Sequence, residues 1–387
     1  MRDSEWHDGP NAGPPRAVYT GVFLLVALVL VLGGGVAWYR ADQLATEFAE
    51  QRAIATAAKS GRPPFTPTEV EMLANKVTPV LVDVETEIRN LGIGGAGTGI
   101  VLSQTGEVLT NNHVINGATT LEVVTKSNQK RYSARVVGYD RNHDVALLQI
   151  TDPKTLATAV ICDSSSVQSG QPILGIGNAG GAGGKPIRAP GKVTGVGRSI
   201  NTSDELTEST ERLQGLIEIA ADIRPGDSGG PLVNEAGQVI GVNTAASINY
   251  KTNIPNGVGY AIPINDAMGI VQTIRAGHST GEVHVGPTGI IGIAVSGPAM
   301  LPGGYLPRSA KPGATVTQIA SGSPAEATGL QRGDTIVELD GAVVDSPTQL
   351  TAIVGRHRPG DRLTVAWVDR AGQRRSGAVT LDEGPPA

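Results

Sequence analysis

The stretch from Ile223 to Val233 reads IRPGDSGGPLV and places one serine, Ser228, inside a run of glycines. A serine oxygen that attacks a carbonyl carbon must be presented on a tight loop whose backbone amides converge on one point. Glycines on both sides allow the close approach and unusual dihedral angles that such a loop requires. An ordinary glycine turn would not require this string followed by Pro231 and an apolar strand. The stretch therefore predicts a nucleophilic serine.

A nucleophilic serine needs an imidazole base and a carboxylate that orients the base. His113 lies in GEVLTNNHVI, where an apolar strand ends and a turn begins. Asp144 lies in RNHDVALLQI, directly before an apolar strand that runs into a core. His143 on that strand would point to the opposite face from Asp144, so we interpret it as structural. The sequence predicts a triad of His113, Asp144 and Ser228.

Short apolar runs such as TGIVLS, TLEVVT, QPILGIG and QVIGVNTA recur between turn signals from about residue 82 to residue 265. This spacing predicts an all-β barrel or sandwich. We expect Gly175 to Gly197 to form a long loop. Gly92, Gly94 and Gly97 fit G-x-G-x-x-G, but strand-like TGIVL follows where a dinucleotide loop needs a helix. Close packing in a barrel is the better interpretation of these glycines.

The chain order His, Asp, Ser is that of the chymotrypsin arrangement. With TNNHVI, DVALLQI, PGDSGGPL and a later GIIGIAV, the sequence resembles the HtrA/Deg family of trypsin-like serine proteases over about residues 70–383. The resemblance implies a mainly β fold, with a chymotrypsin-like double β-barrel protease domain followed by an α+β PDZ domain. It also implies two six-stranded barrels with the triad between them.

The resemblance implies further site residues. The backbone amides of Gly226 and Ser228 would form the oxyanion hole. The strand that pairs with the substrate backbone would comprise Asn243, Thr244 and Ala245. The far wall of the specificity pocket would comprise Gly257, Val258, Gly259 and Tyr260.

Two aspartates depart from the family pattern. Asp227 stands where asparagine is frequent, and we expect it to bind local amides. Asp222 lies six residues before Ser228, where a trypsin carries the carboxylate that binds Arg or Lys. It either selects a basic residue before the scissile bond, or the loop follows HtrA geometry and the pocket takes small aliphatic residues.

The last part of the sequence resembles a PDZ domain through SGSPAEATGLQRGDTIVELDG, Ser321 to Gly341. PDZ domains add a chain end as a strand to an exposed sheet edge, and a loop of free amides binds its carboxylate. Ile290 to Ile293, IIGI, fits that loop. We expect the amides of Ile291, Gly292 and Ile293 to bind the carboxylate of C-terminal peptides.

Ala17 to Tyr39 carries no charged side chain. At 1.5 Å per residue it spans about 35 Å, enough for one transmembrane helix. A cleaved signal peptide would need a shorter apolar core and a small-residue site, whereas GGGVAWYRAD follows Leu32. The expected organisation is a cytoplasmic stub (1–16), a transmembrane helix (17–39), a stalk (40–66), a protease domain (67–281) and a PDZ domain (282–383). We expect a single-pass cell-membrane protein with extracytoplasmic protease and PDZ domains.

The composition of the 387-residue chain narrows the function classes. A net charge of −5 argues against a nucleic-acid partner, and the single cysteine, Cys162, allows neither an intrachain disulfide nor a four-cysteine zinc site. We expect no cofactor and no metal. The leading hypothesis is a serine endopeptidase acting on unfolded or damaged proteins, and the resemblance suggests a homotrimer with Phe65 as an aromatic contact. The alternatives are a mainly non-proteolytic chaperone or binding module, and a regulatory protease with one signalling substrate.

Overall fold

The computed structural model describes residues 64–88, 93–181, 183–203, 210–244, 257–297 and 312–386. The expected stub, the transmembrane helix and all but the end of the stalk lie outside these residues. Within the described part, no helix has the length and apolar character needed to cross a membrane. Strands dominate what is described, as the spacing of the apolar runs predicts.

The first barrel is formed by strands that pair in the order β4, β1, β2, β3, β6 and β5, and pairing of β5 with β4 closes it. Alternating apolar residues such as Val82, Val84 and Leu148 fill its interior. A short strand, β13, adds to the other side of β5. The bounds are β1 (Leu81–Ile88), β2 (Ile93–Val101), β3 (Glu107–Thr110), β4 (Thr120–Thr125), β5 (Arg131–Asp140), β6 (Val145–Ile150) and β13 (Val283–Val285).

The glycines of β2 serve close packing in this barrel. A Cβ atom at Gly97 would lie 2.7 Å from the side chain of Val114, and one at Gly99 would lie 2.5 Å from Val108. Gly94 and Gly97 stand on strand β2, which β3 follows, so neither belongs to a dinucleotide loop. Close barrel packing is confirmed for Gly97, whereas Gly94 is exposed and a Cβ atom there would make only an ordinary contact of 3.7 Å. Gly92 lies outside the described residues.

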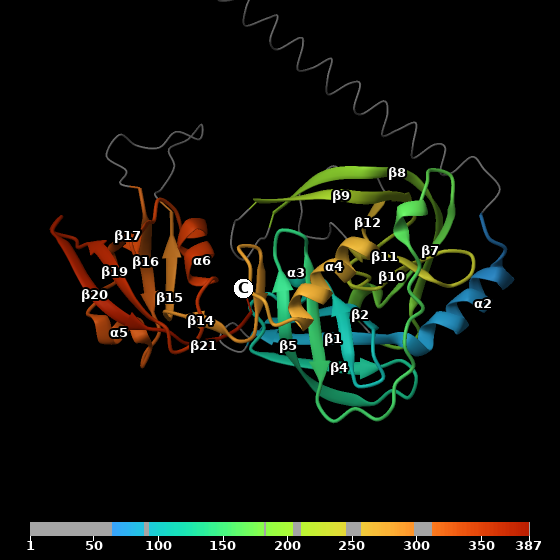
Figure 1. Ribbon diagram of the computed structural model, residues 1–387, viewed down its shortest axis with the longest axis horizontal. Helices are drawn as coiled ribbons and strands as arrows, with labels where there is room; N and C mark the ends of the chain where they lie inside the picture. Colours follow the sequence, from blue (N-terminus) through green and yellow to red (C-terminus); the bar gives the residue numbers. More distant parts are fainter. Residues whose placement is uncertain are drawn as a thin grey trace, which may run out of the picture. The chain divides into compact units, whose positions relative to one another are not determined.

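The second barrel is closed, in the order β10, β11, β12, β9, β8 and β7. Its longest strands, β8 and β9, run side by side as an antiparallel ribbon (Figure 1). The bounds are β7 (Pro172–Gly177), β8 (Ile187–Ser203), β9 (Thr210–Ala220), β10 (Pro231–Val233), β11 (Val239–Thr244) and β12 (Gly259–Pro263).

The expected loop from Gly175 to Gly197 is wrong at both ends, because β7 extends to Gly177 and β8 begins at Ile187. A Cβ atom at Gly191 would lie 2.2 Å from the carbonyl oxygen of Ala220. Glycine inside β8 therefore permits close approach of the neighbouring strand, and the sequence signal for a turn was a signal for packing.

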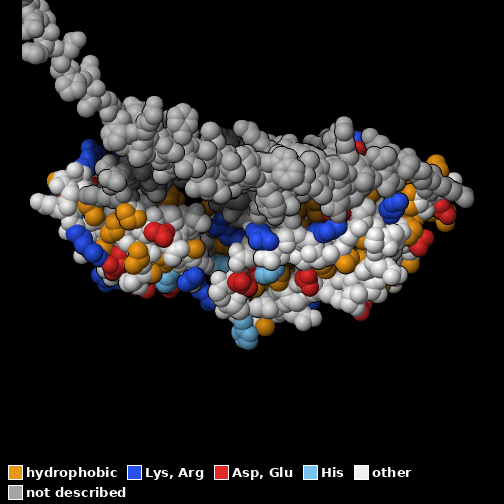
Figure 2. Space-filling model, turned by 90° about the horizontal axis from the view of Figure 1, so that it is seen from above, with side chains coloured by type: hydrophobic (Ala, Val, Ile, Leu, Met, Phe, Trp, Pro, Cys, Tyr) orange, Lys and Arg blue, Asp and Glu red, His pale blue; other side chains and the backbone are white. Residues whose placement is uncertain are grey.

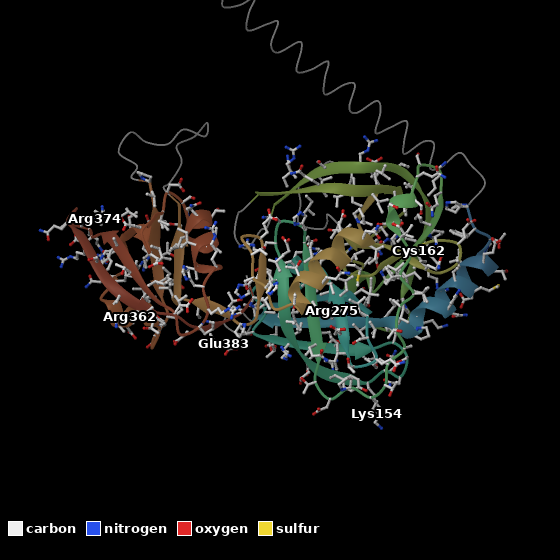
Figure 3. The ribbon with its side chains drawn as sticks, viewed as in Figure 1. Lys154, Cys162, Arg275, Arg362, Arg374 and Glu383 are labelled. Carbon is white, nitrogen blue, oxygen red and sulfur yellow. The ribbon has the colours of Figure 1, made fainter. Side chains whose placement is uncertain are left out.

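Two helices cover the protease domain. Helix α2 (Pro67–Val77) begins with Thr66, whose side chain accepts from the amide of Glu69 while the Glu69 carboxylate accepts from the amide of Thr66, a capping box. Helix α4 (Ile264–Arg275) ends at Arg275, which is labelled in Figure 3. The guanidinium of Arg275 binds the carboxylate of Glu107 in β3 at 2.8 Å.

Phe65 is only 6% exposed and belongs to the chain's own hydrophobic core, together with Leu73 and Val77 of α2. The expectation that Phe65 makes an aromatic contact between subunits is therefore wrong. Its apolar ring is already covered by its own chain, which leaves almost none of it for a second copy.

The second domain is a sheet in the order β15, β16, β17, β19 and β20, with β18 paired to β17 and two helices, α5 and α6. A separate strand pair joins β14 to β21. The sequence also predicts helices over SPAEATG, residues 323–329, and SPTQLTAIVGRH, residues 346–357, and these correspond to α5 and α6. The bounds are β14 (Thr288–Ile290), β15 (Ile293–Ser296), β16 (Ala314–Ile319), α5 (Pro324–Thr328), β17 (Thr335–Leu339), β18 (Ala342–Val343), α6 (Pro347–Val354), β19 (Arg362–Val368), β20 (Arg374–Thr380) and β21 (Asp382–Gly384).

On the face seen in Figure 2, basic and acidic side chains are interspersed among hydrophobic ones. The visible described residues there form no large surface of one charge. This agrees with the modest net charge of the chain.

Candidate active site

His113 is placed by a short helix, α3 (Asn112–Ile115), that follows directly after β3. Val114 and Ile115 of this helix are buried in the core of the first barrel, which anchors the helix. The side chain of His113 remains 40% exposed. The local sequence thus alternates buried anchors with one accessible imidazole.

Asp144 ends a turn that begins at Arg141, whose carbonyl oxygen accepts from the Asp144 amide at 3.2 Å. The backbone of Asp144 has φ 54°, a left-handed conformation that costs a non-glycine residue about 1–2 kcal/mol. The side-chain amide of Asn111 donates to the Asp144 carbonyl oxygen at 2.8 Å and holds this conformation. The strained turn aims a buried carboxylate at α3.

His113 and Asp144 are in direct contact. Nδ1 of His113 lies 2.8 Å from Oδ2 and 3.0 Å from Oδ1 of Asp144, and the backbone amide of His113 donates to Oδ1 at 3.0 Å. Thr244, at the end of β11, adds a hydroxyl that donates to Oδ2 at 3.0 Å. Three donors therefore hold a buried carboxylate that orients the imidazole, with contributions from both barrels.

The loop around Ser228 is fixed by backbone contacts to both barrels. The Ser228 carbonyl oxygen accepts from the amide of Thr98 in β2, and the amide of Gly229 donates to Asn243 in β11. The neighbour of Asn243 is Thr244, which binds Asp144. One short stretch of β11 therefore joins the serine loop to the aspartate, and Ser228 is 5% exposed.

The glycines of this loop are required by contact. Cβ atoms at Gly226, Gly229 and Gly230 would lie 2.2, 2.1 and 2.2 Å from carbonyl oxygens of Asn178, Thr98 and Ile176. Gly226 and Gly229 also have φ of 90° and 82°, which glycine adopts without strain. The hydroxyl of Thr98 donates to the carbonyl oxygen of Gly226 at 2.7 Å, which orients the expected oxyanion-hole residue.

The two aspartates before Ser228 have different surroundings. Asp227 is buried and accepts from the amide of Arg224 at 2.9 Å, so the expectation of local amides is confirmed. Asp222 has a side chain that is 59% exposed and binds the guanidinium of Arg224 at 2.5 Å. A trypsin-like specificity carboxylate would instead be enclosed by its pocket.

Sequence reasoning missed Ile223, which lies between them in the chain. A Cβ atom at Gly175 or Gly259 would lie 2.5 or 2.8 Å from its side chain. Ile223 is therefore packed beside β7 and β12, next to the strand expected to form the pocket wall. An apolar residue five positions before Ser228 was the available signal.

Of the residues expected to pair with the substrate backbone, Asn243 and Thr244 are already engaged within the protein. Asn243 is fully buried, its side chain donates to the Pro231 carbonyl oxygen, and its backbone bonds to Gly229 and Gly230. The prediction of Asn243 as a substrate contact is therefore wrong, because its polar groups serve the serine loop. Thr244 uses its hydroxyl for Asp144, and Ala245 lies outside the described residues.

The expected pocket wall begins at Gly257, which has φ 93°, continues through Val258 and enters β12 at Gly259. Tyr260 is half-buried on β12. Burial raises the pKa of its phenol, nearby Glu218 raises it further, and Arg198 opposes them. The phenol therefore stays neutral beside the pocket at ordinary pH.

In the second domain, Ile291 and Gly292 directly precede β15, the edge strand of the sheet, and Ile293 is its first residue. Gly292 has φ 82°, and a Cβ atom there would lie 2.3 Å from Cβ of Ser323. The carbonyl oxygens of Ile291 and Gly292 accept from the amides of Ala325 and Ala320. The loop conformation is therefore specific to glycine and anchored on its carbonyl side.

His143 lies in the turn from Arg141 to Asp144, so the expectation that it stands on a strand is wrong. Its Nδ1 lies 2.8 Å from Oδ2 of Asp140, and its amide donates to Oδ1 of Asp140 at 3.1 Å. This second aspartate–histidine pair was not recognised from the sequence.

Comparison with known proteins supports the protease and PDZ assignments. Residues 97–242 match the family model of the trypsin-like peptidase domain, and residues 289–381 match that of the PDZ domain. Over 300 residues the chain is 31% identical to the serine protease Do-like HtrA of Bacillus subtilis, which covers 75% of this chain and 64% of that protein.

Two further relatives give the same result. The chain is 34% identical over 271 residues to the periplasmic serine endoprotease DegP of Escherichia coli, covering 70% of this chain and 53% of that protein. It is 32% identical over 296 residues to the serine protease Do-like HtrA of Lactobacillus helveticus, covering 74% and 68%. It thus spans between about half and two thirds of the length of these relatives. With both domains matched and the His113–Asp144 contact beside the glycine-framed Ser228, the chain belongs to the HtrA family of trypsin-like serine proteases with a PDZ domain.

Proposed function

We propose that this protein is a membrane-anchored HtrA-type endopeptidase that hydrolyses unfolded or damaged extracytoplasmic proteins. The contact between His113 and Asp144, tied through Thr244 and β11 to the Ser228 loop, carries the proposal. The apolar stretch from Ala17 to Tyr39 supports the anchor.

In the proposed mechanism, the hydroxyl of Ser228 attacks the scissile carbonyl carbon while Nε2 of His113 accepts its proton. Asp144 holds Nδ1–H of the imidazole and stabilises the imidazolium that forms. The amides of Gly226 and Ser228 bind the oxyanion, and His113 then returns the proton to the leaving amine. Water repeats the sequence on the acyl-enzyme and regenerates Ser228.

The pocket before the scissile bond is proposed to take small aliphatic residues. The exposure of Asp222, its pairing with Arg224 and the packing of Ile223 beside Gly259 support this preference. Matched peptides that differ only in Val or Arg before the scissile bond test it. A preference for Arg that Asp222→Asn abolishes would contradict it.

The PDZ domain is proposed to bind the C-termini of protein substrates along β15, with the carboxylate at Ile291, Gly292 and Ile293. The edge position of β15 supports this mode, since an edge strand can accept another strand. Gly292→Ala should weaken binding of a fluorescent C-terminal peptide at least tenfold. The same peptide with an amidated C-terminus is the ligand control.

Casein degradation by the wild type and by Ser228→Ala tests the endopeptidase. Loss of the nucleophile should lower the rate by about 10⁵–10⁶-fold. Ser166→Ala, at an exposed serine, is the matched control and should keep full activity. If wild type and Ser228→Ala are equally inert across pH and temperature, a non-proteolytic binding module is the better function. Cleavage of one cellular protein without casein would favour a regulatory protease.

A further inference from the structure

A cluster of one histidine and two carboxylates lies away from the serine. Asp140 ends β5, His143 lies in the following turn, and Glu282 immediately precedes β13. One ligand atom from each of the three residues lies within 4.8 Å of the others. The described residues hold no other group of three His, Cys, Asp or Glu side chains with this spacing.

The strands fix the cluster in place. Strand β13 pairs antiparallel with β5, and Val283 stands opposite Asp140, so Glu282 is held beside the end of β5. Asp140 is only 1% exposed, whereas His143 and Glu282 are exposed toward solvent. A buried carboxylate is thus set beneath two accessible ligands on a rigid scaffold, as a metal site requires.

A cavity of about 560 Å³ opens at the cluster, and its lining includes His143 and Glu282. It is large enough to admit an ion with its remaining water ligands. Arg141, Arg212 and Arg356 line the same cavity. These cations oppose an ion held by charge alone, such as Mg²⁺ or Ca²⁺, and favour a metal that bonds strongly to imidazole.

The electrostatics of Asp140 also favour a cation. Burial raises the pKa of its carboxyl group, His143 opposes the rise, and the neighbouring charge of Glu282 adds to it. Two carboxylates therefore share one small region with a single imidazole. A divalent ion would neutralise both carboxylates.

We propose that Asp140, His143 and Glu282 bind a divalent transition-metal ion, with Zn²⁺ as the test ion. One imidazole and two carboxylates, completed by water, form an ordinary donor set for zinc. Bonds of about 2.0–2.1 Å at a tetrahedral angle require about 3.3 Å between neighbouring ligand atoms. Nδ1 of His143 and Oδ2 of Asp140 are 2.8 Å apart, so the ion replaces the proton between them after a small opening.

The ion would connect Glu282, which precedes β13, to Asp140 at the end of β5 and to His143 in the turn that follows. Asp144, the proposed orienting carboxylate, follows His143 directly and sits in its left-handed conformation. Metal binding therefore stiffens the turn that presents Asp144, without contributing a ligand to the catalytic site.

Zinc titration by calorimetry tests the site, with the full chain carrying Ser228→Ala to prevent self-cleavage. Because His113 and Asp144 can also bind zinc, each measurement is repeated with His113→Ala. One zinc per chain should remain with His113→Ala. His143→Ala and Glu282→Gln should each weaken that zinc at least tenfold, the lower bound known for disturbing even an outer-shell partner.

His278→Ala, at an exposed histidine of the same segment, is the control and should bind as the parent. Substitution with Co²⁺ gives an independent readout, since a tetrahedral site produces an intense visible absorption that His143→Ala should remove. Melting temperatures without metal check that the variants fold, and exposed Glu282 is the safer substitution. Unchanged zinc affinity in Glu282→Gln and His143→Ala, or no binding by the His113→Ala chain, would overturn the proposal.

Discussion

Two aspartate–histidine pairs meet at one turn of this chain, and they have nearly the same internal geometry. In both pairs Nδ1 lies 2.8 Å from Oδ2, and the histidine amide donates to Oδ1, at 3.0 Å for His113 and 3.1 Å for His143. Their surroundings differ. Asp144 also accepts from Thr244 and is held by Asn111, whereas Asp140 and His143 form a local pair three residues apart.

A carboxylate beside an imidazole therefore does not by itself make a catalytic pair. Only the His113 pair is tied, through β11, to a serine on a glycine-framed loop. His143 instead lines a cavity together with a second carboxylate, that of Glu282. In the proposed roles, the same histidine–aspartate contact serves proton transfer beside Ser228 and metal binding beside Glu282. The third side chain at each place decides the role.

Among the substitutions that test the two pairs, Asp144→Asn is expected to have the largest effect on activity. An amide in this place holds the imidazole in the wrong tautomer and cannot stabilise the imidazolium, so kcat should fall by about 10⁴-fold. Hydrolysis of a chromogenic peptide measures it. Retention of more than a tenth of the activity would show that the roles assigned to the two pairs are wrong.

Asp140→Asn makes the matched change in the other pair. In metal-free buffer, kcat should stay within about threefold of the wild type, because Asp140 touches neither His113 nor Ser228. A loss close to that of Asp144→Asn would remove the distinction between the pairs.

A third buried carboxylate, Asp83, is paired with a lysine instead of a histidine. Asp83 binds Lys126 in the first barrel with both side chains nearly fully buried, and burial raises the pKa of Asp83 while Lys126 opposes it. Asp83→Asn leaves a buried ammonium without its counter-charge and should lower the free energy of unfolding by about 3–5 kcal/mol. Urea denaturation measures this effect.

The double variant Asp83→Leu with Lys126→Met removes both charges and should be close to neutral. If the single and double variants lose the same stability, the cost comes from packing and not from the unpaired charge.

Thr244→Val tests the hydroxyl donor that Asp144 has and Asp140 does not. The change keeps the shape of the side chain and removes the hydroxyl from Oδ2 of Asp144. A lost hydrogen bond to a charged group is worth about 1.5 kcal/mol, so kcat should fall about tenfold. Equal activity in Thr244→Val and wild type would show that the third donor is dispensable.

The smallest effect is expected at the half-buried phenol of Tyr260. The raised pKa of Tyr260 means that the unfolded chain loses the phenolic proton first as the pH rises above about 10. The contribution of the neutral phenol to stability is full below that pH and is lost as the pH rises through the folded pKa. Tyr260→Phe should therefore lose less stability than wild type at alkaline pH, as measured by urea denaturation at pH 8 and above pH 10. Parallel losses in the two proteins would contradict the shift.

Much of the fold was predictable because the local signals agree with the tertiary contacts. The apolar runs became barrel strands, SPAEATG and SPTQLTAIVGRH became helices, and the glycines around Ser228 stand where carbonyl oxygens exclude a Cβ atom. Two of the failures share a physical cause. Gly191 and Asn243 contact neighbouring strands and the serine loop, so the residues next to them in sequence could not reveal that they were covered.

The sequence by itself determined the chemistry this protein carries: a serine on a glycine loop, one histidine after a strand and one aspartate before a strand. Each lies in a string whose residue types have a local reason. Only the tertiary structure decided that Asp222 is exposed, that Thr244 reaches Asp144, and that Glu282 reaches Asp140. Strand pairing sets these distances between residues far apart in the chain, and a periodic pattern carries no information about them.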